Sequence, residues 1–116
     1  AASDVYKRQQ PAQAGLAEAL AKVELREPSV PVYSNVTGQA HVGAASIAGT
    51  MVDQVTSSVR WEACIRAMIA DGVTRFIELG PGTALTGFMR RIDRVLEVLN
   101  VAGNDSLAKS AEALNA

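Results

Sequence analysis

The sequence predicts an α/β protein with a short, mostly parallel sheet of three strands and flanking helices. Apolar residues recur at helical spacing in five segments, and three short runs rich in β-branched residues lie between them. Because strands separated by helices need crossover connections, the strands are expected to run parallel to one another. A chain of 116 residues is long enough for one small domain.

The first helix is predicted over 11–23, where Leu16, Leu20 and Val23 share one face. The next stretch, "SVPVYSNV" over 29–36, is rich in β-branched and aromatic residues and predicts the first strand. Pro31 favours the start of this strand or the edge of a sheet, because proline cannot donate a ladder hydrogen bond.

Two consecutive helices are predicted next. A polar, glycine-containing loop over 37–45 precedes the first of them, over 46–55, for which Ser46 is the expected N-cap. The second follows in "SVRWEACIRAMIADG", with Gly72 as its stop. Its apolar face comprises Trp61, Ile65, Met68 and Ile69.

The last third of the chain predicts strand, helix, strand, helix. The strand "VTRFIEL" over 73–79 is broken by "GPG", and Thr83 can cap the helix that follows. A third strand is expected over 95–102 and a last helix over 105–114. The residues expected to face inward on these two helices are Leu85, Phe88, Met89, Ile92, Leu107, Ala111 and Leu114.

Composition excludes several classes of function. The formal net charge is −1 and no basic patch suggests nucleic acid or a membrane surface as partner. No apolar run approaches the roughly 18–20 residues of a membrane-spanning helix. The single cysteine, Cys64, cannot form an internal disulfide, and no group of residues has the spacing of metal ligands. We therefore expect a cytoplasmic protein without a metal or another cofactor.

The stretch "ELGPGT" could bind an anion, because a glycine turn followed by a helix start directs backbone N–H groups outward. It lacks the lysine of a phosphate-binding loop and the glycine pattern of a dinucleotide site, so an ordinary turn between strand and helix is favoured. Glu78 can be an active-site acid, cap a neighbouring helix or pair with an arginine. The candidate arginines are Arg75, Arg90 and Arg91.

No complete catalytic constellation is visible from residue types alone. His41, the single histidine, is expected to be a solvated loop residue, and Cys64 a buried, inert thiol. Ser34, Ser57 and Ser58 lack the glycine elbow of a nucleophile. The carbonyl of Gln54, in the last turn of its predicted helix, could accept a hydrogen bond from elsewhere, although simple capping is the plainer interpretation.

Taken together, several stretches resemble a known family. The segments "PVYSNVTG", "MVDQVTSSVRWEACIRAMIADG", "VTRFIELGPG" and "LTGFMRRI", in this order and spacing, are similar to the C-terminal part of the malonyl-CoA:acyl carrier protein transacylase family. The resemblance covers 11–116 and implies a partial α/β-hydrolase-like core that carries a ferredoxin-like subdomain.

The resemblance also implies a reaction. In this family a serine takes malonyl from coenzyme A, a histidine serves as general base, and the phosphopantetheine thiol of acyl carrier protein accepts the malonyl group for fatty acid biosynthesis. An arginine binds the malonyl carboxylate. The serine, histidine and arginine positions of the family fall outside this chain, and His41 does not match the catalytic histidine. The chain is therefore expected to be inactive alone, and the complete enzyme to be a monomer.

One position of the family's site does match. Gln54 corresponds to the glutamine whose main-chain carbonyl orients the catalytic imidazole, in place of the carboxylate of a conventional triad. The resemblance therefore reverses the plainer interpretation of this residue. Ser34, Asn35 and the turn 80–82 are expected to shape the floor near the site, without a chemical role.

Residues 1–10 are interpreted separately from 11–116. The six residues "DVYKRQ" are what a sequencing-library transposon end encodes in this frame, so 1–10 are expected to be a non-native, disordered adapter scar without core contacts. The scar would mark where the coding sequence was cut, just past the catalytic histidine.

Two alternative functions stay open. The chain could be a small α/β module that binds an anionic ligand at the "GPGT" turn, or a structural or interaction domain. A transferase fragment should expose apolar strand edges and helix faces and aggregate when expressed alone.

Overall fold

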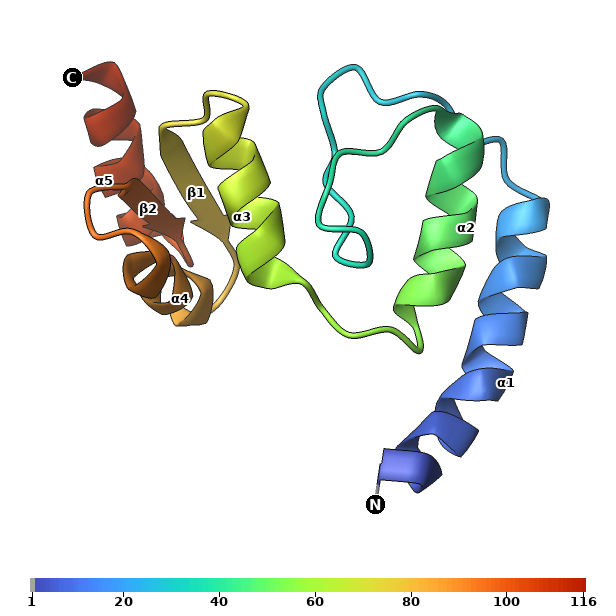
Figure 1. Ribbon diagram of the computed structural model, residues 1–116. Coiled ribbons are helices and arrows are strands. Elements are labelled where there is room, and N and C mark those ends of the chain that lie inside the picture. The colour runs from blue at the N-terminus through green and yellow to red at the C-terminus, as the bar shows by residue number, and fades with distance from the viewer. Residues whose placement is uncertain (1) are drawn as a thin grey trace. The chain divides into compact units, whose positions relative to one another are not determined.

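The computed structural model describes residues 2–116, and side chains from Lys7 onward. The chain forms two compact units, Ala1–Ala67 and Met68–Ala116. Figure 1 shows the elements, which confirm the α/β class. They are α1 (Ala2–Ala21), α2 (Ala44–Gln54), α3 (Trp61–Ala70), β1 (Arg75–Leu79), α4 (Ala84–Ile92), β2 (Glu97–Val101) and α5 (Asn104–Asn115).

Helix α1 begins at Ala2, so the prediction of a disordered start is wrong for residues 2–10. Alanine, lysine, arginine and glutamine are good helix formers, which allows the helix to extend upstream of Pro11. Pro11 lies inside the helix, where it removes one backbone donor. The non-native origin of this segment stays a prediction.

The predicted strand over 29–36 does not form. The segment contains only an isolated antiparallel bridge between Tyr33 and Ala40. Prolines at 28 and 31 limit backbone pairing, and the chain turns back at once, since the Ser34 N–H donates to the Gln39 carbonyl at 2.9 Å. The result is a tight loop instead of a sheet strand.

Helices α2 and α3 lie close to their predicted positions. Helix α2 begins two residues before Ser46, with Gly43 as N-cap, and the Ser46 hydroxyl donates to the Gly43 carbonyl at 3.0 Å. Helix α2 packs against α1 (Figure 1). Helix α3 ends before Gly72, whose φ of +96° is the left-handed geometry expected of a C-terminal glycine.

The sheet of the second unit has two strands among the described residues, not the three predicted. Strands β1 and β2 are parallel, as expected, and Arg75 lies opposite Glu97 in their register. The Arg75 Nε and the Glu97 Oε2 form an ion pair at 2.6 Å. The strand missing from the sheet is the one predicted over 29–36, whose residues form the loop around Tyr33 in the first unit.

Helices α4 and α5 both pack on β2. The buried side chains of α4 are Thr86 and Met89. On α5 the inward face is wrong in the prediction, because Leu107 and Leu114 are exposed and Ser110 is buried. Ser110 can be buried because its hydroxyl donates to the Asn100 carbonyl of β2 at 3.0 Å.

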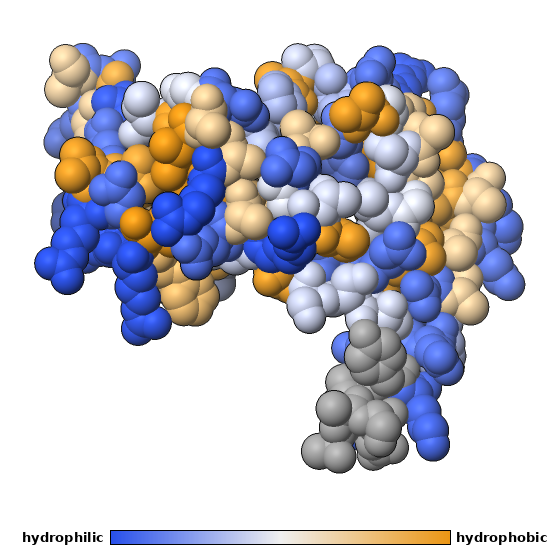
Figure 2. All heavy atoms as spheres, viewed as in Figure 1, coloured by the Kyte–Doolittle hydropathy of each residue, from blue (hydrophilic) through white to orange (hydrophobic). Residues whose placement is uncertain are grey.

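Much apolar surface is exposed. From Lys7 onward, the buried apolar side chains are Cys64, Ile65 and Met89, whereas Leu79 at the end of β1 is 77% exposed and Val95 is 92% exposed. Figure 2 shows such hydrophobic side chains at the surface beside hydrophilic ones. This is the exposure expected of a fragment; aggregation stays a prediction.

Candidate functional site

The first unit contains a cavity of about 240 Å³ between the loop after α1 and helix α2. It contains Gln54, the residue predicted for the site, together with Ser34 and Asn35, which were expected to shape its floor. The turn 80–82 belongs to the second unit. The full lining is Tyr33, Ser34, Asn35, His41, Thr50, Met51 and Gln54.

Ser34 anchors the loop that forms one wall of the cavity. It is 6% exposed, and its hydroxyl accepts a hydrogen bond from the Val36 N–H at 3.1 Å. Its carbonyl accepts from the Gly38 N–H at 2.8 Å and from the Cys64 thiol at 3.3 Å. The loop is therefore held both to itself and to α3.

Gln54 is the last residue of α2. The next two backbone N–H groups do not donate to the Gln54 carbonyl. Val55 donates to the Val52 carbonyl at 3.3 Å and Thr56 to the Asp53 carbonyl at 3.2 Å. None of the described residues donates a hydrogen bond to the Gln54 carbonyl. No described side chain caps this carbonyl, which is therefore available to an external donor.

His41 lies in a loop, as expected, but its side chain is half-buried in the cavity wall. Its Nδ1 lies 3.2 Å from the Thr50 Oγ1 of helix α2, and its backbone N–H donates to the Val32 carbonyl at 2.9 Å. The nine-residue separation of His41 and Thr50 carries no sequence signal that could have revealed this contact.

Cys64 is 2% exposed, as predicted, and burial raises the pKa of its thiol. A raised pKa keeps the sulfur protonated and therefore a weak nucleophile. Its thiol donates to the Ser34 carbonyl, which is a structural contact.

No group of His, Cys, Asp or Glu side chains that could hold a metal ion occurs in the described part of the chain.

Glu78 caps helix α4, one of the roles that the sequence left open. Its Oε1 accepts from the Leu85 N–H at 3.1 Å, and its Oε2 accepts from the Thr86 N–H at 2.9 Å and from the Thr86 hydroxyl. The Thr83 side chain makes no capping hydrogen bond. Hydrogen bonds from the Thr86 side chain and then from the two backbone N–H groups lower the pKa of Glu78, outweighing partial burial.

This carboxylate weakens the case for an anion site at the "GPGT" turn. The first-turn N–H groups of Leu85 and Thr86, which would bind an anion, already bind Glu78. A second anion there would also meet a negative charge at close range. The helix start is therefore a structural cap.

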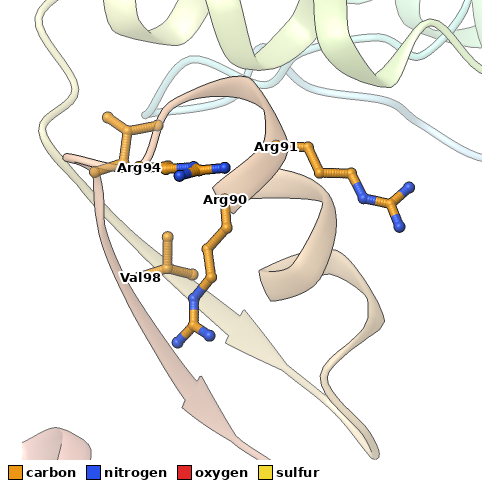
Figure 3. Close-up of a pocket in the computed structure, with 5 residues that line it drawn as sticks. Arg90, Arg91, Arg94 and Val98 are labelled. Carbon is orange, nitrogen blue, oxygen red and sulfur yellow. The ribbon is translucent and has the colours of Figure 1, made fainter.

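A second concave surface lies in the other unit, between the end of α4 and β2 (Figure 3). It is a pocket of about 700 Å³ lined by three arginines with Leu96 and Val98. Figure 3 shows the Arg90 side chain extending past Val98 and the Arg91 side chain pointing away from it. Within the described chain, no carboxylate pairs with any of the three. They are Arg90, Arg91 and Arg94.

Sequence reasoning missed this arginine pocket. The net charge is close to zero, which hides a local cluster, yet "RRIDR" places three arginines within five residues. A scan for local charge would have found it.

No helix in the described residues is long and apolar enough to cross a membrane.

No protein-family model matches the chain. Curated relatives do: the malonyl CoA-acyl carrier protein transacylase of Bacillus subtilis is 35% identical over 104 residues, which are 90% of this chain and 33% of the relative. The corresponding protein of Salmonella typhimurium is 39% identical over 82 residues, 71% of this chain and 26% of the relative.

The solved structures that are similar to this chain are also malonyl transacylases. The structure is similar to the malonyl CoA-acyl carrier protein transacylase of Clostridium perfringens, with a TM-score of 0.86 and 38% identity over 91% of this chain and 34% of the other. It is also similar, with a TM-score of 0.81 and 33% identity over 89% of this chain and 33% of the other, to a malonyl-transacylase solved in complex with its type II polyketide synthase acyl-carrier protein. The chain spans about a third of the length of these relatives. It therefore belongs to the malonyl CoA-acyl carrier protein transacylase family.

Proposed function

We propose that this chain is part of an acyltransferase that moves malonyl from coenzyme A to the phosphopantetheine thiol of acyl carrier protein in fatty acid biosynthesis. The observation that carries the proposal is the similarity to malonyl CoA-acyl carrier protein transacylases along 90% of the chain. In the complete enzyme, β1 and β2 would belong to a larger, hydrolase-like parallel sheet. That enzyme is expected to be a cytoplasmic monomer that uses no cofactor.

The proposed mechanism proceeds through a serine acyl-enzyme. The serine oxygen attacks the thioester carbonyl of malonyl-CoA while a histidine accepts its proton, and the coenzyme A thiol leaves. The histidine then accepts the proton of the phosphopantetheine thiol, whose sulfur attacks the malonyl-serine ester, and the released serine oxygen regains its proton from the histidine. We place the serine, the histidine and the malonate-binding arginine outside this chain, which would then be inactive alone.

Gln54 is the residue of this chain that we place in the catalytic machinery. Gln54 ends α2 and lines the cavity, and its carbonyl, which accepts no hydrogen bond from the described residues, can accept an N–H of the catalytic imidazole. An oriented imidazole has one nitrogen fixed as a donor and the other free to act as base. The side chain of Gln54 has no part in this role, because the acceptor is a backbone atom.

The arginine pocket supports the proposed substrates in a different way. Coenzyme A and phosphopantetheine both carry phosphate groups, and guanidinium groups bind phosphate oxygens through paired hydrogen bonds. Arg90, Arg91 and Arg94 have no carboxylate partner among the described residues, so their charge is available. We propose that this pocket receives the phosphate-bearing end of the carrier.

A chimera tests the function. Residues 11–116 would replace the matching third of the Bacillus subtilis relative, which would supply the remaining catalytic groups. The chimera should transfer radiolabelled malonyl from coenzyme A to acyl carrier protein, and the 116-residue chain alone should not. A folded chimera without transfer activity would contradict the proposal.

The same chimera tests the role of Gln54. Gln54→Ala keeps the backbone carbonyl and should cost much less activity than replacement of the catalytic histidine, which removes a general base worth roughly 100-fold or more. Equal losses from the two changes would rule out the backbone role.

A further inference from the structure

The cavity beside Gln54 is built for an uncharged ligand. Its lining contains no carboxylate, ammonium or guanidinium group, in contrast to the arginine pocket. A charged ligand group in this cavity would lose hydration without gaining an opposite charge. Uncharged polar groups of the lining must therefore define what the cavity binds, and for His41 the hydrogen bonds assign which ring nitrogen donates and which accepts.

Thr50 determines which ring nitrogen of His41 carries the proton. The Thr50 hydroxyl has one proton to donate. Its oxygen lies 2.9 Å from the Ser46 carbonyl oxygen and 3.1 Å from the Ile47 carbonyl oxygen of its own helix. This is the usual contact of a threonine inside a helix, and it occupies the hydroxyl proton. Toward the His41 Nδ1, at 3.2 Å, the hydroxyl oxygen can then only accept, so Nδ1 carries the imidazole proton.

A neutral imidazole with its proton on Nδ1 has a lone pair on Nε2. No described residue forms a hydrogen bond with His41 Nε2. His41 lines the cavity, so its Nε2 is an unoccupied acceptor there, separate from the Gln54 carbonyl that we place against the catalytic imidazole. A neutral lining with this acceptor fits a ligand group that has an N–H donor and no charge, which is the chemistry of a secondary amide.

We propose that His41 is a ligand-binding residue whose Nε2 accepts a hydrogen bond from an amide N–H, and that Thr50 positions it by holding the proton on Nδ1. The ligand class rests on the proposed function, because the pantetheine arm shared by coenzyme A and acyl carrier protein contains two secondary amides. The tautomer of His41 follows from the contacts of Thr50 alone.

The tautomer is measured first, in the 116-residue chain. Because His41 is the single histidine, a ¹⁵N-histidine-labelled sample gives one unambiguous pair of ring nitrogens. At mildly alkaline pH, Nδ1 should show the shift of a protonated nitrogen and Nε2 that of an unprotonated one. Thr50→Ser should keep this pattern, whereas Thr50→Val should give the Nε2–H tautomer. An Nε2–H tautomer in the unsubstituted chain would overturn the proposal, whatever the function of the protein.

Binding is measured next, with pantetheine as the probe because it carries the amides without the phosphates. Pantetheine should move the His41 Nε2 resonance in the unsubstituted chain and in Thr50→Ser, and this response should be lost in Thr50→Val. No shift of Nε2 at saturating probe would contradict the amide ligand. In the active chimera, Thr50→Val should raise KM with little change in kcat. A rise for malonyl-CoA would assign the amide to coenzyme A, a rise for the carrier protein would assign it to acyl carrier protein, and no rise for either would contradict the binding role.

Discussion

The carboxylate of Glu78, near the end of β1, caps helix α4 through Thr86. Its Oε2 lies 2.9 Å from the Thr86 N–H and also accepts the Thr86 hydroxyl proton. Eight residues separate the two, and the glycine turn 80–82 lies between them in the chain. The contact connects β1 to α4, and the Glu78 carboxylate accepts hydrogen bonds from the N-terminus of that helix.

Stability should therefore depend on the ionisation of Glu78. Its pKa is lowered in the folded chain, so its contribution is fully present above the pKa of an unfolded glutamate and is lost as pH falls through the lower, folded pKa. Glu78→Gln should lower the melting temperature near neutral pH and remove part of the acid-induced loss. Thermal melts from neutral pH down to well below the ordinary pKa of a glutamate check this, with Glu112→Gln on α5 as the control.

If Glu78→Gln melts at the same temperature as the unsubstituted chain across that range, the cap contributes nothing to stability. A drop of the same size in Glu112→Gln would indicate a general charge effect instead.

Gly38 provides a prediction about packing. A Cβ at this position would lie 2.7 Å from the Ala63 Cβ of α3, and the φ of Gly38 is +70°. Gly38→Ala therefore adds a clash to backbone strain and should lower the free energy of unfolding, measured by urea titration, by about 1–3 kcal/mol more than Gly43→Ala. Gly43 is the matched control, because it has a φ of +76° and open space around it.

The clash can be separated from the strain by a double-mutant cycle. Ala63→Gly removes the atom that the new Cβ would meet, so Gly38→Ala should cost less in that background. An equal cost in both backgrounds would assign the whole effect to backbone strain.

The accuracy of the sequence predictions differs from segment to segment for physical reasons. In α3 the apolar face and Gly72 act together, and in β1 and β2 short apolar runs lie between turn residues, so local signals agree with the final structure. The stretch 29–36 has β propensity, but a strand needs a partner. Pro31, with Pro28 just before the stretch, and the tight turn leave only one bridge. Local propensity could not provide that partner.

The position of helix α5 along the chain is predicted correctly, but the face that it turns toward β2 is not. Leucine at 107 and 114 predicts an apolar inward face, yet the hydrogen bond from Ser110 to the Asn100 carbonyl turns a polar face toward β2. In the candidate site, Gln54 could be predicted from resemblance, whereas the Thr50–His41 contact depends on how a loop folds back onto α2. No sequence spacing reports such a contact.

Cys64 should resist modification in the native chain. It is buried, and burial raises the pKa of its thiol, so little thiolate is present at neutral pH. A chromogenic disulfide reagent should react slowly in buffer and rapidly in denaturing urea. Because the unfolded chain loses the burial, the ratio of the two rates reports the opening of the contact with Ser34. Equal rates in the two conditions would mean that the thiol is accessible in the native chain.

The arginine pocket gives the last prediction. Arg90 and Arg94 have no carboxylate partner in the described chain, so in the active chimera Arg90→Gln and Arg94→Gln should each weaken binding of acyl carrier protein by about tenfold, or ~1.4 kcal/mol. The loss should shrink at high salt, because screening removes the same attraction. Arg66→Gln is the matched control, since Arg66 lies on α3 and its guanidinium is paired with Glu62 at 2.7 Å. Titration calorimetry at two salt concentrations measures the affinities, and an equal loss in Arg66→Gln would mean that net charge, and not this pocket, attracts the carrier.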